Sequence, residues 1–214
     1  ICFPFFMKAK VNKKHFRVAI FGSARLKKND VRYKQVFNLA KGFAKEGLDV
    51  VTGGGPGIMD AASKGHHAGR GKNNVHSVGL TIKLPMEQVD SFHLDIKKDF
   101  SRFSKRLDTF MEMSNVVVVA PGGVGTLLEL LYTWQLVQVK HICEIPIILL
   151  GQHWQGLIDW IKKEMLRKKL MSKEDFNSVF VVKNNLQAMK IICSVHKDFK
   201  KNPHVCSNFK KYRK

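Results

Sequence analysis

Hydrophobic and polar residues along the chain follow two alternating patterns. Short runs that are apolar throughout predict buried strands at 16–21, 48–52, 75–82, 115–120, 145–150 and 179–182. Segments with apolar residues every three or four positions predict amphipathic helices at 33–46, 58–67, 103–114, 126–139, 154–168 and 186–195. Buried strands that are each followed by a helix are typical of a parallel sheet covered on both faces. We therefore predict a single-domain α/β fold, a Rossmann-like doubly wound parallel sheet with helices on both faces.

Three turns rich in glycine or small residues follow three of the predicted strands. They lie at 22–24 (first loop), 53–57 (second loop) and 121–125 (third loop). A doubly wound sheet binds its ligand beyond the carboxyl ends of the strands, so these loops are expected to converge on one crevice.

The third loop is the most informative stretch because it opens a helix and places Glu129 one turn further on. Helix N-termini carry unpaired N–H groups and a partial positive charge, which attract phosphate. Glycine lets the backbone approach that phosphate closely, since it has no Cβ atom. The pattern predicts a phosphorylated substrate with a carboxylate beside it.

Composition narrows the class of protein. A chain of 214 residues, 44% of them hydrophobic, is long enough for one sizeable core. No apolar run approaches the ~20 residues of a membrane-spanning helix, and residues 1–6 are too short for a secretion signal. The four scattered cysteines indicate reduced thiols in a cytoplasmic protein. The pair His66-His67 lacks a carboxylate or cysteine at ligand spacing, so we expect it at an exposed helix end and predict no metal site.

The net charge of +20 is unusual for an enzyme that acts on a small molecule. Part of it gathers at the chain ends, which suggests a basic N-terminal segment (1–15), a folded domain (16–196) and a basic C-terminal tail (197–214). Solvated tails are the first interpretation, and weak contact with an anionic polymer or lipid is the second. Neither aromatic interleaving nor a nucleic-acid reader motif accompanies the charge.

Three motifs occur in an order and at a spacing that resemble the Lonely Guy family, once widely labelled possible lysine decarboxylase. They are Phe21-Gly22-Ser23-Ala24-Arg25, TGGGPGIMDAA at 52–62 and PGGVGTLLE at 121–129. Further agreement comes from Leu84-Pro85-Met86-Glu87-Gln88, from Arg106 and from Trp134-Gln135. The similarity extends over roughly residues 16–195. Either glycine motif alone is a weak signal, but the two together are specific.

This resemblance implies a phosphoribohydrolase, an enzyme that hydrolyses the N-glycosidic bond of a nucleoside 5′-monophosphate. The substrate would be AMP or an N6-modified AMP (a cytokinin nucleotide), and the products would be free base and ribose 5-phosphate. It also implies a homodimer or larger homo-oligomer, with the active site near the subunit interface and with neither cofactor nor metal. A pyridoxal-phosphate decarboxylase would need a Schiff-base lysine with supporting partners, and the sequence has no motif for one.

Site residues follow from the motifs and from the chemistry. Glycosidic cleavage passes through an oxocarbenium-like ribose, so a carboxylate beside the sugar stabilises positive charge or activates water. The resemblance assigns that role to Glu129 and places Arg106 beside it as the second catalytic residue. The predicted substrate- and phosphate-binding set is Ser23, Gly53, Gly54, Gly55, Gly57, Met59, Glu87, Gly122, Gly123, Gly125 and Thr126.

The chain also departs from the family pattern. The lysine that usually follows the arginine is Leu107, the acidic residue before the glutamate is Leu128, and a further glutamate is Tyr132. An asparagine expected near Asp90 is absent. These departures leave the identity of the base open.

Several alternatives stand beside this interpretation. Glu129 could be a solvated helix carboxylate, and Arg106 an exposed cation paired with Asp108 or Glu112. The whole protein could be a non-catalytic nucleotide or molybdenum-cofactor carrier on the same fold. A third alternative is a nucleic-acid-associated protein that binds through its basic ends. The presence of both Glu129 and Arg106 favours the enzyme.

Overall fold

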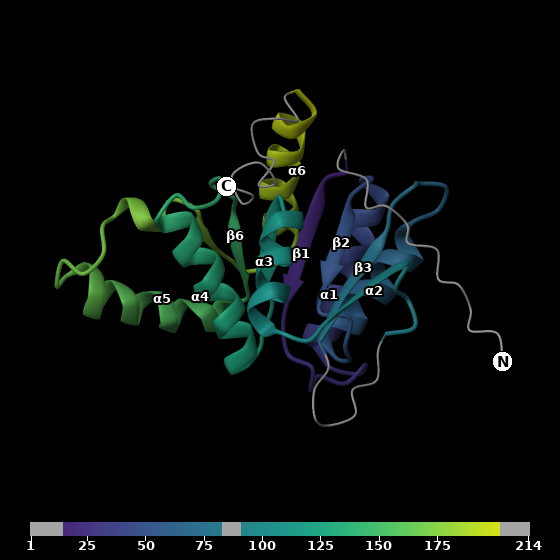
Figure 1. The fold of residues 1–214 in the computed structure, drawn as a ribbon, viewed down its shortest axis with the longest axis horizontal. Coiled ribbons are helices and arrows are strands. Elements are labelled where there is room, and N and C mark those ends of the chain that lie inside the picture. Colours follow the sequence, from purple (N-terminus) through teal and green to yellow (C-terminus); the bar gives the residue numbers. More distant parts are fainter. Residues whose placement is uncertain (1–14, 83–90, 202–214) are drawn as a thin grey trace.

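The computed structural model describes residues 15–82 and 91–201 (Figure 1). Its centre is one seven-stranded sheet in the order β4-β3-β2-β1-β5-β6-β7, and all neighbouring strands are parallel. The strands are β1 (Arg17–Phe21), β2 (Asp49–Thr52), β3 (Ser77–Ile82), β4 (Ile96–Phe100), β5 (Val116–Val119), β6 (Ile147–Leu150) and β7 (Val179–Val182). The predicted doubly wound α/β fold is confirmed.

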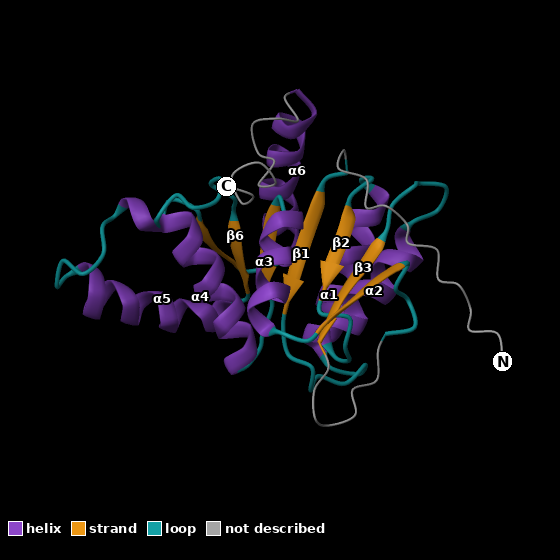
Figure 2. Ribbon diagram, in the orientation of Figure 1, coloured by secondary structure: helices purple, strands orange, loops and turns teal. Residues whose placement is uncertain are grey.

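Helices cover both faces of this sheet (Figure 2). They are α1 (Val31–Lys45), α2 (Ile58–Gly69), α3 (Phe103–Met113), α4 (Val124–Gln138), α5 (Gln155–Ile161) and α6 (Asn185–Lys201). On one face α1, α2 and α6 pack against side chains such as Val18 and Ile20. On the other face α3, α4 and α5 pack against Ala19 and Phe21. Alternate residues of β1 therefore supply two separate hydrophobic cores, which is why its sequence is apolar throughout.

Three elements differ from the pattern-based expectation. Strand β4 was not predicted, because its central residues Lys97, Lys98 and Asp99 are exposed at the sheet edge and hide the strand signal. The helix expected at 154–168 is divided into a 3₁₀ turn (Gln152–Trp154), α5 and a π-helical turn (Lys162–Leu166). Helix α6 continues to Lys201 with Phe199 in the core, past the boundary expected at residue 196. None of the helices in the described ranges is long and apolar enough to cross a membrane.

The expectation of an exposed His66-His67 pair was wrong for His66. This side chain is fully buried, and its Nε2 atom lies 2.9 Å from the carbonyl oxygen of Leu48. Burial lowers the pKa of His66, so the ring is neutral and donates this hydrogen bond. It joins the last turns of α2 to the residue before β2, a packing role that polarity alone did not reveal.

The three glycine loops are tied to one another at the carboxyl ends of the strands. The backbone N–H of Ser23 donates to the carbonyl of Pro121 at 3.0 Å, and the N–H of Ile58 donates to the carbonyl of Ser23 at 2.9 Å. Gly57 has a φ of +68°, and a Cβ atom there would lie 2.3 Å from the Ser23 carbonyl oxygen. Glycine at this position therefore lets the first and second loops touch through their backbones.

Replacing Gly57 by alanine is expected to lower the free energy of unfolding by about 2 kcal/mol or more, from positive-φ strain and the clash with Ser23. Gly125 is the matched control, since nothing lies within 4 Å of a Cβ atom added there. Gly125→Ala, in the first turn of α4, is expected to raise stability by about 0.5 kcal/mol. Urea denaturation measures both. A Gly57→Ala protein as stable as the parent would show that the loops are not locked together.

Candidate active site

The third loop and the start of α4 form a seat of the kind that binds phosphate. The helix begins at Val124, and its first helical hydrogen bond runs from the N–H of Leu127 to the carbonyl of Gly123 at 3.0 Å. The N–H groups in the first turn thus precede the helical ladder and are available to an anion. Gly122, Gly123 and Gly125 are exposed here. The geometry suits an anionic ligand lying against the backbone.

Thr126 completes this seat from inside. Its side chain is buried, and a Cβ atom on Gly122 would lie 2.0 Å from the Thr126 Oγ1 atom. Only glycine at position 122 lets the hydroxyl fold back against the loop. Gly122 and Thr126 of the motif therefore depend on each other, because a larger residue at position 122 would collide with the threonine side chain.

Glu129 and Arg106 meet in the structure. The Arg106 Nη2 atom on α3 donates to the Glu129 Oε1 atom on α4 at 3.2 Å. Both side chains are nearly buried, with exposed fractions of 11% and 12%. The alternatives of a solvated Glu129 and of an exposed Arg106 paired with Asp108 or Glu112 are therefore wrong.

The Arg106 guanidinium is held between aromatic rings. It lies 5.6 Å from the ring centroids of both Phe103 and Phe110, which stand three positions before and four positions after it on α3. Its Nε atom is buried without a hydrogen-bond partner in the described part of the chain. The two rings fix the plane of the cation, and its Nη2 atom points to Glu129. Sequence reasoning did not assign these phenylalanines, although their helical spacing carried the signal.

Burial determines the protonation of the pair. It raises the pKa of Glu129 to about 7, against the opposite pull of the Arg106 charge. Burial also lowers the pKa of Arg106, which the carboxylate partly offsets, and arginine remains a cation throughout the physiological range. A carboxyl group that titrates near neutrality exchanges protons at working pH, as general acids and bases do.

The second loop brings its backbone against the same cation. A Cβ atom on Gly53 would lie 3.2 Å from the Arg106 Nη1 atom and 2.7 Å from the Met59 sulfur. Arg106 thus lies between Glu129 on α4 and the loop that follows β2. Gly53 provides the space that both Arg106 and Met59 occupy, which explains why glycine stands there.

The structure brings most of the predicted set to one edge of the sheet. Gly53 approaches both Arg106 and Met59. Gly57 meets Ser23, Ser23 is hydrogen-bonded to Pro121 beside Gly122, and Gly122 meets Thr126. Gly54, Gly55, Gly123 and Gly125 belong to the same loops. Glu87 lies outside the described residues, as do Leu84-Pro85-Met86, Gln88 and Asp90.

A cavity of 370 Å³ opens beside the first and third loops. It is lined by Ser23, Leu26, Arg32, Pro121, Gly122 and His153. Arg106 and Glu129 are not among these residues, so the cavity lies beside the first and third loops and not at the ion pair. Arg32 adds a positive charge, although both its Nε and Nη2 atoms donate to Asp30, at 2.9 and 2.6 Å. Sequence reasoning missed Arg32 and His153 because neither belongs to a motif.

Asp60 supports the second loop and was also missed as a functional neighbour. Its carboxylate accepts hydrogen bonds from the Tyr33 hydroxyl at 2.6 Å and from the Ser91 hydroxyl at 3.0 Å. The backbone N–H of Ser91 in turn donates to the Gly54 carbonyl at 2.8 Å. Asp60 stands inside the quoted glycine motif, but its partners are distant in sequence, so no local pattern could predict them.

The structure shows where the residues that depart from the family pattern lie. Leu107 is buried, and Leu128 is exposed on α4. The Tyr132 hydroxyl donates a short hydrogen bond to the Asp108 carboxylate, which joins α4 to α3 beside the Arg106–Glu129 pair. Tyr132 therefore supports the two helices that carry the pair.

Comparison with known proteins agrees with this geometry. The chain is 29% identical over 153 residues to a probable cytokinin riboside 5′-monophosphate phosphoribohydrolase of Oryza sativa subsp. japonica, covering 69% of this chain and 59% of the relative. It is 31% identical over 124 residues to the pyrimidine/purine nucleotide 5′-monophosphate nucleosidase of Escherichia coli K12, covering 54% of this chain and 26% of the relative. The chain thus spans less than two thirds of either relative.

The fold recurs in solved structures. The molybdenum cofactor carrier protein of Chlamydomonas reinhardtii superposes with a TM-score of 0.61 at 21% identity, covering 86% of this chain and 99% of the carrier, which shows a shared fold. The family model described as possible lysine decarboxylase matches residues 59–192. That range is more than half of the chain and contains both Arg106 and Glu129. The chain therefore belongs to this family, the Lonely Guy family that its glycine motifs resemble.

Proposed function

We propose that the protein is a nucleoside 5′-monophosphate phosphoribohydrolase, which hydrolyses the N-glycosidic bond of AMP or an N6-modified AMP to free base and ribose 5-phosphate. The observation that carries the proposal is the Arg106–Glu129 ion pair, nearly buried just beyond a helix N-terminus suited to phosphate. The names of the rice and Escherichia coli relatives, both of which specify nucleoside 5′-monophosphates, support it.

In the proposed reaction the bond between the ribose C1′ atom and the base nitrogen breaks, and its electron pair leaves with the base. The ribose develops positive charge, which the Glu129 carboxylate stabilises. Glu129 then accepts a proton from the water whose oxygen bonds to C1′ and passes it to the departing nitrogen, which regenerates the carboxylate. Arg106 holds the carboxylate in place and adds positive charge where the leaving base becomes electron-rich. The reaction needs neither a cofactor nor a metal.

The phosphate end of the substrate would lie against the third loop. The first-turn N–H groups of α4 and the Thr126 hydroxyl supply donors, and Ser23 and the second loop complete the seat. We propose a purine such as adenine as the base of the substrate. The scattered cysteines support a cytoplasmic enzyme.

Glu129→Gln tests the catalytic assignment. The amide keeps the size of the side chain but accepts no proton from water, so kcat for AMP is expected to fall by about 10²–10⁴-fold. The affinity for AMP is expected to change by less than about threefold, because the phosphate seat is intact. Chromatography measures free adenine, and calorimetry measures binding.

Glu144→Gln is the matched control, since Glu144 is an exposed carboxylate ahead of β6 at the opposite edge of the sheet. It is expected to retain the parent activity. Near-normal activity of the Glu129→Gln protein would remove Glu129 from the mechanism. Absence of base release from every nucleotide tested with the unmodified protein would overturn the enzyme proposal.

The pH dependence follows from the raised pKa of Glu129, which is about 7. Only the unprotonated carboxylate accepts a proton, so kcat/KM is expected to rise with pH, with a midpoint near this pKa of the free protein, and to fall about tenfold per unit below it. A profile of kcat/KM with AMP between about pH 5.5 and 8.5 checks this, spanning the titration on both sides.

The substrate phosphate also titrates, with a pKa of about 6. Measuring AMP binding to the Glu129→Gln protein over the same pH range separates its effect from that of Glu129. A profile of kcat/KM that is flat across neutrality would contradict the assignment of Glu129 as base.

A non-catalytic nucleotide or molybdenum-cofactor carrier is the second candidate, favoured by the shared fold with the Chlamydomonas reinhardtii carrier. A carrier needs an anion seat but no carboxyl group that titrates near neutrality. The buried Glu129 beside Arg106 therefore favours hydrolysis. Tight AMP binding without base release would reverse this preference.

We also propose that the protein is a homo-oligomer, a dimer or larger. Val124, Leu128 and Leu131 are exposed apolar residues spaced by four and three positions, so they form one stripe along α4. This stripe lies on the helix that carries Glu129. A second copy packed on it would remove the apolar stripe from water and cover one flank of the candidate active site.

Leu131→Glu tests the oligomer. If two copies pack through this stripe, the substitution places one buried charge from each subunit in their contact. The dissociation constant of the oligomer is therefore expected to rise by at least about tenfold. Light scattering coupled to size-exclusion chromatography measures the mass. Leu186→Glu, on the exposed surface of α6, is the control and is expected to leave the mass unchanged. A monomeric parent protein would refute the proposal.

A further inference from the structure

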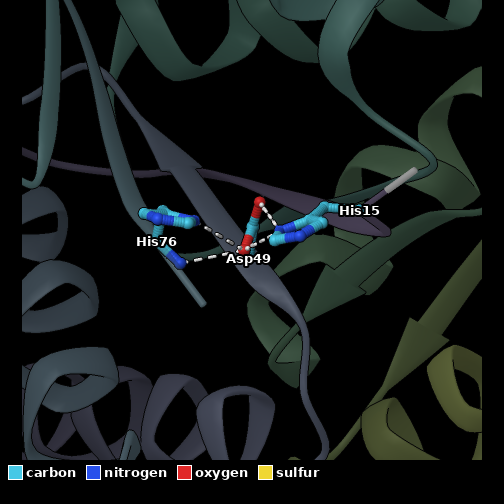
Figure 3. A group of neighbouring side chains, drawn as sticks. All are labelled: His15, Asp49 and His76. Atoms are coloured by element: carbon cyan, nitrogen blue, oxygen red, sulfur yellow. Dashed lines mark hydrogen bonds and ion pairs between the residues drawn. The ribbon is translucent and has the colours of Figure 1, made fainter. Parts of the chain in front are cut away.

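We propose that His15, Asp49 and His76 form a binding site for a divalent transition-metal ion, at the edge of the sheet opposite the candidate active site. One ligand atom from each residue lies within 4.8 Å of the others. Figure 3 shows the two imidazole rings on either side of the Asp49 carboxylate. Two histidines and one carboxylate are a recurrent ligand set for such ions.

The sheet register brings these residues together. Asp49 is the first residue of β2, His15 stands two residues before β1, and His76 stands one residue before β3. Arg17 of β1 pairs with Asp49, and Val50 of β2 pairs with Ser77 of β3. The amino ends of three adjacent strands therefore meet at Asp49. The sequence predicts no metal site from its scattered cysteines or from the neighbours of His66-His67, and these three ligands come from distant segments that no local spacing connects.

The interatomic distances are close to those of a metal site. The His15 Nδ1 atom lies 3.1 and 3.2 Å from the two Asp49 oxygens, and the His76 Nδ1 atom lies 3.8 Å from Oδ1. Ligands at the ~2.0–2.2 Å typical of Zn²⁺ stand roughly 3.3 Å apart on a tetrahedron. His15 already has this spacing from Asp49, whereas the His76 Nδ1 atom lies farther away and would have to approach the carboxylate when an ion binds.

The carboxylate is pre-oriented by its other contacts. The backbone N–H of His76 donates to the Asp49 Oδ1 atom at 2.8 Å, and the Arg17 Nε atom lies 3.6 Å from Oδ2. These interactions hold Asp49 at the bottom of the cluster, where its side chain is only 3% exposed. The Arg17 charge opposes a cation, so we expect micromolar rather than nanomolar affinity.

Solvent reaches the cluster from the histidine side. The side chains of His15 and His76 are 19% and 32% exposed. A cavity of 300 Å³ lined by His15, Phe16, Gly47, Asn74, His196, Phe199 and Lys200 adjoins His15. An ion can therefore enter, and water can fill the remaining coordination positions. Such an ion would tie three strands together without contacting the Arg106–Glu129 pair.

Zinc binding to tag-free, chelator-treated protein tests the site. Equilibrium dialysis followed by metal analysis is expected to find one tightest Zn²⁺ per chain, with Mg²⁺ failing to compete because two of the ligands are imidazoles. Zinc is also expected to raise the melting temperature, since it binds the folded form.

His15→Ala and His76→Ala are each expected to weaken zinc binding by at least about tenfold. His67→Ala is the matched control, because His67 lies in a ring pair with His93 and is not part of the Asp49 cluster. It should bind zinc as the parent does. Circular dichroism confirms that each variant is folded, and AMP hydrolysis is expected to be unchanged in all three. Equal zinc affinity in the three variants, or absence of zinc binding by the parent, would overturn the site.

Discussion

All seven strands of the sheet point in the same direction, and the candidate site depends on this constraint. Parallel strands deliver every following loop to one edge, so segments more than sixty residues apart can share a ligand. Two backbone hydrogen bonds, from Ser23 to Pro121 and from Ile58 to Ser23, then fasten the three loops together. The helices that leave this edge carry Arg106 and Glu129 inward. The ion pair between α3 and α4 is thus a consequence of sheet direction as well as of residue identity.

Burial of the Arg106–Glu129 pair lowers the stability of the folded protein at neutral pH, and the same burial raises the pKa of the Glu129 carboxyl group. A carboxyl group whose pKa rises from 4.5 to about 7 on folding binds more protons in the folded state than in the unfolded state. Its contribution to stability therefore declines as the pH rises from about 4.5 through about 7 and is constant above that. The surrounding rings of Phe103 and Phe110 and the Tyr132–Asp108 hydrogen bond hold the two helices that bear the charges. Packing around the pair offsets the cost of burying the Glu129 carboxyl group.

Much of the fold could be predicted because its strands are fully buried and its loops need glycine. Val116–Val119 faces a core on both sides, and an unbroken run of valines is typical of such a central parallel strand. Strand β4 could not be predicted, since its exposed Lys97, Lys98 and Asp99 lie at an edge where polarity is tolerated. The motifs indicated Arg106 and Glu129 separately. Their contact depends on how α3 and α4 lie against each other, which no local pattern states. His66 was misassigned because a buried hydrogen bond to Leu48 looks like surface polarity in sequence.

The parallel direction of the strands also makes the edge formed by their carboxyl ends chemically different from the edge formed by their amino ends. At the carboxyl edge helices begin, so partial positive charge gathers there, as a phosphate requires. At the amino edge helices end: α1 stops at Lys45 ahead of Asp49, and α2 stops at Gly69 ahead of His76. The partial negative charge of helix C-termini favours cations, and the Asp49 carboxylate stands at this edge between two imidazoles. One topology therefore accounts for both proposed sites, the anion site beside Glu129 and the cation site beside Asp49, and places them at opposite ends of the strands.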